Sequence, residues 1–139
     1  MLLEKMKQDI RYLEYIPKQR TNDKLPLLVY LHGAGERGNE LQTINTHGPI
    51  KEMLGSTIAS DFIVVAPQCE ESKTWWDYAE RLYAFLIEYL ADPLIVLYRV
   101  RLVGLGTGGV LMKAAISILK AKQVIMQNIN YYLRRCIFY

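Results

Sequence analysis

The sequence contains little cysteine. Cys69 and Cys136 are the two cysteines among 139 residues, and they stand far apart without the C-x-x-C spacing of zinc and redox sites. This pattern argues against a disulfide framework and against a metal centre. We expect both thiols to be reduced and structural, and we expect no metal and no cofactor.

Long apolar runs are also missing. The apolar run at residues 94–98 lies between Pro93 and Arg99, and it is far shorter than the roughly 18 residues of a membrane-spanning helix. The first 11 residues mix charged and apolar side chains, which does not resemble a secretory signal. The sequence therefore predicts a cytoplasmic protein without a membrane partner.

Acidic residues are absent from the last third of the chain. All 14 Asp and Glu residues precede residue 93, whereas residues 93–139 contain seven Lys and Arg residues. Both histidines, His32 and His47, also come early. The basic end contains no recognisable nucleic-acid-binding module, so we expect a solvated surface there and no nucleic-acid partner.

The sequence does contain enough apolar material for one globular domain over residues 1–139, because 51% of its residues are hydrophobic. Residues 11–17 alternate apolar and polar side chains, as a half-buried strand does. Leu25–Leu31 is almost continuously apolar, which is typical of a strand covered on both faces. Residues 61–66 and 98–103 predict two further strands, and the polar residues 18–24 predict a hairpin or loop.

Helices are predicted between these strands. Pro49 suits the first turn of a helix that begins there. The helix predicted over residues 77–90 has apolar side chains at helical spacing, namely Leu82, Phe85, Leu86 and Tyr89. We expect Asp77 to cap this helix, and another helix to follow at residues 110–122. The alternation predicts an α/β fold with a mostly parallel sheet flanked by helices.

Three motifs follow or include the predicted strands. They are LPLLVYLHGAGERGN at 25–39, FIVVAPQC at 62–69 with Trp76 shortly after it, and RLVGLGTGG at 101–109. In this order they resemble the α/β-hydrolase superfamily. Within it they are most similar to the predicted esterases and peptidases related to the phospholipase/carboxylesterase and dienelactone-hydrolase groups.

The resemblance covers residues 11–118 and leaves residues 119–139 unassigned. It implies the N-terminal half of an α/β-hydrolase-type sheet. We interpret the chain as a truncated member of the superfamily, and a frameshift near Ile118 would account for the unassigned tail.

The resemblance also implies a site. The backbone N–H groups of Gly33, Ala34 and Thr107 would form the oxyanion hole, the set of donors that stabilises a developing negative oxygen. Trp76 would line a substrate-binding wall, with packing against the next helix as the alternative, and the ligand would be a small acyl compound. His32 is expected to support the loop and not to act as the catalytic base.

Three other residues near these loops receive structural interpretations. We expect Glu36 and Arg37 to form a solvated surface pair, with a role in holding the oxyanion loop as the alternative. We expect Cys69 to be a small packed residue in its loop.

The third motif decides the question of catalysis. In the superfamily the nucleophile is the middle residue of G-x-S-x-G, the nucleophile elbow between a strand and a helix. Here that residue is Gly106, which has no side-chain atom to attack a carbonyl, and Thr107 is one position out of register. The acid and the base follow the elbow in this fold, yet no Asp, Glu or His follows Gly106. The sequence predicts a serine-hydrolase homologue without hydrolytic activity.

Two other functions stay open. Residues 104–109 also match G-x-G-x-x-G, the dinucleotide-binding fingerprint, although the acidic residue expected about 20 positions later is missing. The strand at 98–103 would lie at a sheet edge if nothing pairs with it, which suits a non-enzymatic interaction domain or a homodimer.

Overall fold

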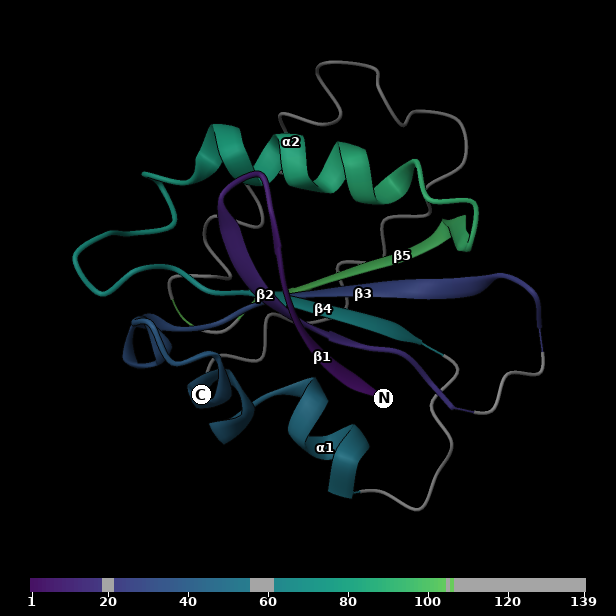
Figure 1. The fold of residues 1–139 in the computed structure, drawn as a ribbon, viewed down its shortest axis with the longest axis horizontal. Coiled ribbons are helices and arrows are strands. Elements are labelled where there is room, and N and C mark those ends of the chain that lie inside the picture. Colours follow the sequence, from purple (N-terminus) through teal and green to yellow (C-terminus); the bar gives the residue numbers. More distant parts are fainter. Residues whose placement is uncertain (19–21, 56–61, 105, 107–139) are drawn as a thin grey trace.

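The computed structural model describes residues 1–18, 22–55, 62–104 and 106. The predicted helix at 110–122, the tail at 119–139 and Thr107 lie outside these residues. Five strands form one sheet (Figure 1): β1 (Leu2–Lys7), β2 (Ile10–Tyr15), β3 (Leu25–Leu31), β4 (Ile63–Pro67) and β5 (Ile95–Gly104). Their spatial order is β1-β2-β4-β3-β5.

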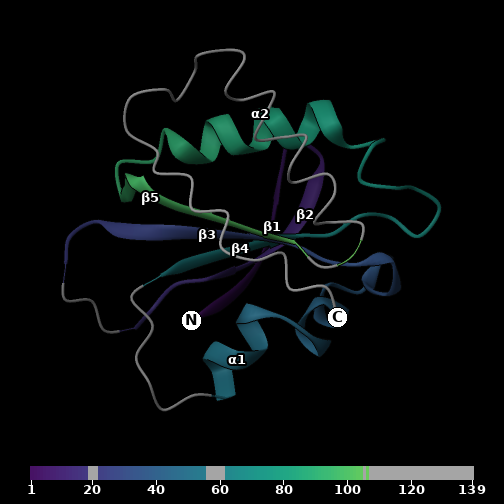
Figure 2. The same cartoon turned by 180° about the vertical axis from the view of Figure 1, so that it is seen from behind.

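The sheet is mixed and lies between helices. Strands β3, β4 and β5 run parallel, while β2 pairs antiparallel with both β1 and β4. Helix α2 (Ala79–Leu90) covers one face, and α1 (Pro49–Gly55) covers the other, as the two opposite views in Figures 1 and 2 show. Two 3₁₀ helices, η1 (Ala34–Glu36) and η2 (Leu41–Thr46), lie between β3 and α1. The predicted α/β class is confirmed.

The predicted strand Leu25–Leu31 is β3, with the same bounds. It occupies an interior position of the sheet, between β4 and β5. Its side chains are buried on both faces, apart from the partly exposed Leu28. A strand covered on both faces must be apolar throughout, and this explains why the pattern was readable from the sequence.

Strand β1 was not predicted. Three of the six residues in its sequence, LLEKMK, are charged, and none of the six is buried, because the strand lies at the edge of the sheet. Gln8 and Asp9 join β1 to β2 with positive φ angles of 53° and 56°, the conformation of the tight turns that connect twisted antiparallel strands. Of the two alternatives predicted for residues 18–24, the hairpin is not formed, because β4 lies between β2 and β3, whereas the loop agrees with the described residues 18 and 22–24. The hairpin is formed by β1 and β2 instead.

Helix α2 is present as predicted, but Asp77 does not cap it. The N-cap residue is Tyr78. The Asp77 carboxylate instead accepts hydrogen bonds from the backbone N–H of Thr74 at 2.7 Å and from its hydroxyl at 3.0 Å. Asp77 therefore closes the turn before the helix, since its side chain bonds backwards along the chain.

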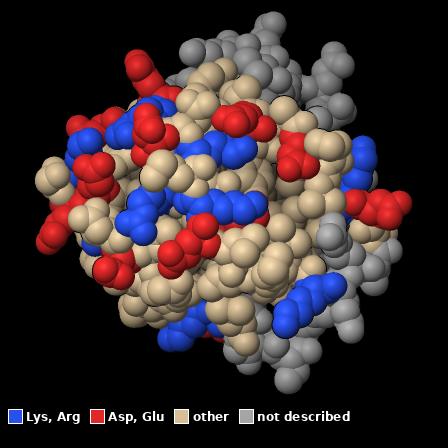
Figure 3. All heavy atoms as spheres, viewed as in Figure 1, with Lys and Arg blue, Asp and Glu red and all other residues tan. Residues whose placement is uncertain are grey.

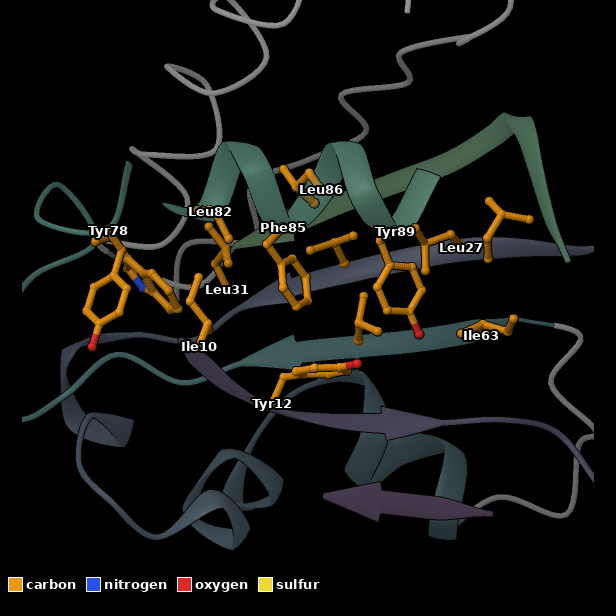
Figure 4. Close-up of a cluster of buried hydrophobic side chains, with 14 of the residues drawn as sticks. Ile10, Tyr12, Leu27, Leu31, Ile63, Tyr78, Leu82, Phe85, Leu86 and Tyr89 are labelled. Carbon is orange, nitrogen blue, oxygen red and sulfur yellow. The ribbon is translucent and has the colours of Figure 1, made fainter. Parts of the chain in front are cut away.

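The larger core lies between α2 and the sheet. Phe85 and Tyr89 point from α2 toward the strands, and Tyr12 rises from β2 to meet them (Figure 4). The rings of Tyr12 and Phe85 pack edge to face with their centroids 5.0 Å apart, an arrangement that aromatic pairs favour. Tyr89 donates its hydroxyl proton to Glu14, which also pairs with Lys5 at 2.6 Å. The hydrogen bond between Tyr89 and Glu14 links α2 to β2.

Polar and charged side chains at the surface link the β1–β2 hairpin to α2. Lys7 and Gln8 both bond the carboxylate of Glu88, at 3.3 Å and 2.8 Å. Lys and Arg side chains are mixed with Asp and Glu over the face seen in Figure 3. Within the described part of the chain, no helix is long and apolar enough to cross a membrane.

Candidate functional site

The carboxyl ends of three parallel strands meet at one edge of the sheet. Leu31, the last residue of β3, pairs with Gly104, the last residue of β5. Val29 of β3 pairs with Val65 of β4, so β4 ends beside them. The loops after β3 and β4 and the turn after β5 therefore lie together, at the edge where open α/β sheets bind ligands.

His32 connects two of these loops from the interior. Its imidazole is completely buried. Nε2 accepts a hydrogen bond from the backbone N–H of Cys69 at 2.9 Å, so the proton is on Nδ1, which donates to the carbonyl of Gly33 at 2.6 Å. Burial lowers the pKa of His32 and keeps the ring neutral. The predicted supporting role agrees with this geometry.

Trp75 supports the same histidine. Its Nε1–H donates to the carbonyl of His32 at 2.9 Å, and the two rings lie with centroids 4.8 Å apart. The side chain of Trp75 is buried, whereas its neighbour Trp76 is 58% exposed. Of the two tryptophans, Trp75 is therefore a packing residue and Trp76 is exposed to solvent.

The backbone N–H of Gly33 is engaged inside the loop. It donates to the carboxylate of Glu36 at 2.8 Å, and Glu36 is buried. Burial raises the pKa of Glu36, while the bond from Gly33 and the charge of His47 act in the opposite direction. The predicted role of Gly33 as a donor to a ligand would require Glu36 to release this N–H group.

Arg37 fixes the other side of the loop. Its Nε–H donates to the carbonyl of Ala34, and its terminal nitrogen donates to the carbonyl of Lys73, both at 3.0 Å. The expected surface pair between Glu36 and Arg37 is wrong, because each side chain bonds loop backbone instead. Both residues hold the loop, which was the alternative interpretation.

Ala34 is an exposed residue whose N–H group points away from the buried His32. The carbonyl of Gly33 belongs to the same peptide unit, and it accepts from His32 Nδ1 at 2.6 Å and from the N–H of Glu36 at 3.3 Å. In a trans peptide the N–H points opposite to the carbonyl, so the Ala34 N–H points away from the buried histidine. Ala34 is exposed, and its N–H is the first of η1, outside the helix's own hydrogen bonds.

Gly106 stands two residues after the end of β5. Its φ is +54°, an angle that L-residues other than glycine adopt only at a cost, and it is exposed. No atom lies within 4 Å of the point that a Cβ would occupy. A positive φ just after a strand is compatible with the predicted nucleophile elbow, and that role of Gly106 stays a prediction. The dinucleotide hypothesis depends on the same turn and stays a prediction.

Gln68 holds the loop after β3 and was not singled out from the sequence. Its buried amide Nε2 donates to the carbonyls of Glu36 at 3.1 Å and Glu40 at 2.9 Å, and to the hydroxyl of Thr43 at 3.1 Å. A polar amide directly after a buried strand is the sequence signal that could have identified it. The neighbouring Cys69 is packed as expected, and burial raises the pKa of its thiol to about 11.

Two predicted site residues remain, Trp76 and Thr107. Trp76 lies in the loop after β4, on the same edge of the sheet as Ala34, while Thr107 is outside the described residues. Within residues 1–18, 22–55, 62–104 and 106, no group of three or more His, Cys, Asp or Glu side chains could hold a metal ion.

Solved esterase structures share this fold. A thermostable esterase is 24% identical, with a TM-score of 0.60 over 88% of this chain and 38% of its own. A hyperthermophilic esterase from the archaeon Pyrobaculum calidifontis is 21% identical, with a TM-score of 0.60 over 82% of this chain and 36% of its own. A thermophilic carboxylesterase cloned from a metagenomic library is 22% identical, with a TM-score of 0.62 over 90% of this chain and 43% of its own.

These similarities are at the level of structure. No protein-family model matches the sequence, and a search of curated proteins gives no match. The chain spans about two fifths of the length of the three esterases. Over that length the chain has the α/β-hydrolase fold.

Proposed function

We propose that this chain is a non-hydrolytic homologue of serine esterases. We propose that it binds a small acyl compound where the carboxyl ends of β3, β4 and β5 meet. The observation that carries the proposal is Gly106, which has a φ of +54° and stands two residues after the end of β5. Acyl transfer in this fold requires a side-chain oxygen at the elbow, and glycine supplies none.

The retained loop supports a binding role. His32, Glu36 and Arg37 all hold the peptide units around Ala34. A fixed, exposed N–H group is a donor for a carbonyl oxygen, and it costs no reorganisation when a ligand binds. Trp76, in the loop after β4, offers an exposed aromatic surface. An ester, amide or acid carbonyl is the ligand group that this arrangement suits.

The test is ester hydrolysis by the whole chain. p-Nitrophenyl acetate and butyrate are incubated with the parent and with Gly106→Ser, and release of p-nitrophenol is compared with a protein-free blank. We expect no turnover from the parent. We expect none from Gly106→Ser either, because no Asp, Glu or His follows the elbow in this sequence. Saturable turnover by the parent would refute the proposal.

A second proposal is a homodimer formed through β5. This strand ends the spatial order of the sheet, and among the described residues no strand pairs with its outer side. An unpaired strand edge is a template for pairing with another chain. Light scattering at several concentrations tests it, and a monomer at all of them would count against the dimer.

A further inference from the structure

Glu36 is a buried charged residue to which the ester-binding scheme gives no direct role. Resting on the proposed function, we infer that Glu36 is the positioning residue of the site, and that it fixes the direction of the Ala34 N–H group by holding both peptide units of Gly33. Glu36 does not touch the ligand in this account.

Gly33 needs such support because of its own chemistry. Glycine lacks a Cβ, so its φ and ψ angles are the least restricted of any residue. The angle ψ of Gly33 sets the plane of the peptide that carries the Ala34 N–H. Gly33 has a φ of −79° and a ψ of 179°. Without external contacts this plane would rotate, and the donor would have no fixed direction.

Glu36 supplies contacts to both peptide units. Its carboxylate accepts the N–H of Gly33 at 2.8 Å, which fixes the peptide before the glycine Cα. Its backbone N–H donates to the carbonyl of Gly33 at 3.3 Å, which fixes the peptide after it. His32 Nδ1 adds a second donor to the same carbonyl. The first unit is also held through the carbonyl of His32, which accepts from Trp75 at 2.9 Å. The bond from the carboxylate is the contact to the N–H group of that unit, and it comes from a side chain that mutation can change.

The burial of Glu36 fits this role. The side chain is 5% exposed, and a carboxylate in that position loses most of its hydration. The titratable groups that interact with it are His47 at the end of η2 and Tyr30 on β3. A surface pair with Arg37 would have avoided the cost of burial. The carboxylate is buried because its acceptor oxygen is used by Gly33.

Two variants separate the acceptor from the rest of the side chain. Glu36→Gln keeps an acceptor oxygen of the same reach, and Glu36→Met keeps the length and volume but has no comparable acceptor. Both retain the backbone N–H of residue 36. Gly33 amide hydrogen exchange, measured by NMR with Val29 and Val65 as internal references for folding, reports the contact without any ligand.

We expect the Gly33 amide to be protected in the parent and in Glu36→Gln, and to exchange about fivefold faster in Glu36→Met, because a net hydrogen bond of roughly 1 kcal/mol corresponds to that change. Val29 and Val65 should keep their protection in all three proteins. Unprotected Gly33 in the parent would overturn the inference, and so would Gln and Met variants that behave alike.

A titration with a ligand tests whether the contact between Glu36 and Gly33 affects binding. The probe is butyramide, a small acyl compound with a neutral carbonyl, titrated while the shift of the Ala34 amide is followed. We expect Glu36→Met to weaken binding at least fivefold and Glu36→Gln to restore it. If the parent does not bind butyramide, the proposed function fails, while Gly33 exchange still decides the role of Glu36. If all three proteins bind equally, Glu36 has no positioning role.

Discussion

The imidazole of His32 and the backbone of Cys69 join the ends of two neighbouring strands. Nε2 of His32 accepts the N–H of Cys69 at 2.9 Å, and its other nitrogen bonds Gly33. The loop after β3 is thereby fixed to the loop after β4 by one neutral ring. The candidate site depends on that ring remaining neutral.

A pH dependence of stability follows. Burial lowers the pKa of His32 in the folded chain below the ordinary value of 6.5. Below pH 6.5 the unfolded chain therefore binds a proton that the folded chain does not, and stability falls as pH falls from 6.5 toward the folded pKa. The slope for one proton is about 1.4 kcal/mol per pH unit.

Urea unfolding between pH 7 and pH 5 measures this slope. In His32→Gln the side-chain oxygen can still accept the N–H of Cys69, but it does not titrate. This variant should be less stable at pH 7 and should lose the contribution of His32 to the slope. An unchanged slope in His32→Gln would show that other groups account for the pH dependence.

Substitution of the two adjacent tryptophans should change the free energy of unfolding by different amounts. Trp75→Phe removes the donor to the buried carbonyl of His32, and leaving such a carbonyl unsatisfied costs about 1–3 kcal/mol. Trp76→Phe affects a side chain that is 58% exposed, so the free energy of unfolding should change by less than about 0.5 kcal/mol. Thermal or urea unfolding distinguishes the two. Equal losses would mean that Trp76 is also a packing residue.

Three glycines form a matched series for backbone strain. Gly106→Ala places a side chain at a φ of +54° in open space, so it should cost about 1–2 kcal/mol from conformation alone. Gly35→Ala also enters open space but has no positive φ, so it should be neutral or slightly stabilising. Gly48→Ala should cost most, because its φ is +94° and its Cβ would lie 2.6 Å from the ring of Tyr30. Urea unfolding of the three variants gives the order, and a Gly106→Ala variant as stable as Gly35→Ala would contradict the elbow geometry.

Ala34→Pro removes the proposed donor alone. Ala34 is the first residue of η1, where proline is well tolerated, and Gly33 before it has the extended conformation that precedes proline. The free energy of unfolding should therefore change by less than about 1 kcal/mol. Binding of butyramide, followed by NMR, should be lost. Ala34→Ser keeps the N–H group and should bind as the parent does; equal binding by the proline variant would remove Ala34 from the site.

The sequence predicted the elements whose burial leaves a strong pattern. Strand β3 is apolar along its length because both faces are covered, and α2 has Phe85 and Tyr89 on its inner face. The turn at Gly106 was predictable because glycine spacing after a strand is a local signal. In each case the residues that carry the pattern are close together in the sequence.

The features that were missed depend on partners far away in the sequence. Strand β1 is charged because it lies at an edge, and its pairing with β2 determines that it is a strand. Gln68 reaches the carbonyl of Glu36, 32 residues earlier. The carboxylate of Glu36 faces inward to Gly33, whereas its charge alone suggested a surface pair with Arg37. Neither the composition of the sequence nor the spacing of its residues indicates these contacts.

The most direct test of the central claim, that the elbow has no nucleophile, is intact-mass analysis after treatment with a fluorophosphonate, which forms a covalent adduct with an activated serine or threonine oxygen. A reference serine esterase is labelled in parallel to confirm that the reagent is active. The account predicts that the mass of the parent chain stays unchanged while the reference enzyme is fully labelled. A stoichiometric adduct on the parent, mapped by peptide sequencing to residues 104–109, would contradict it.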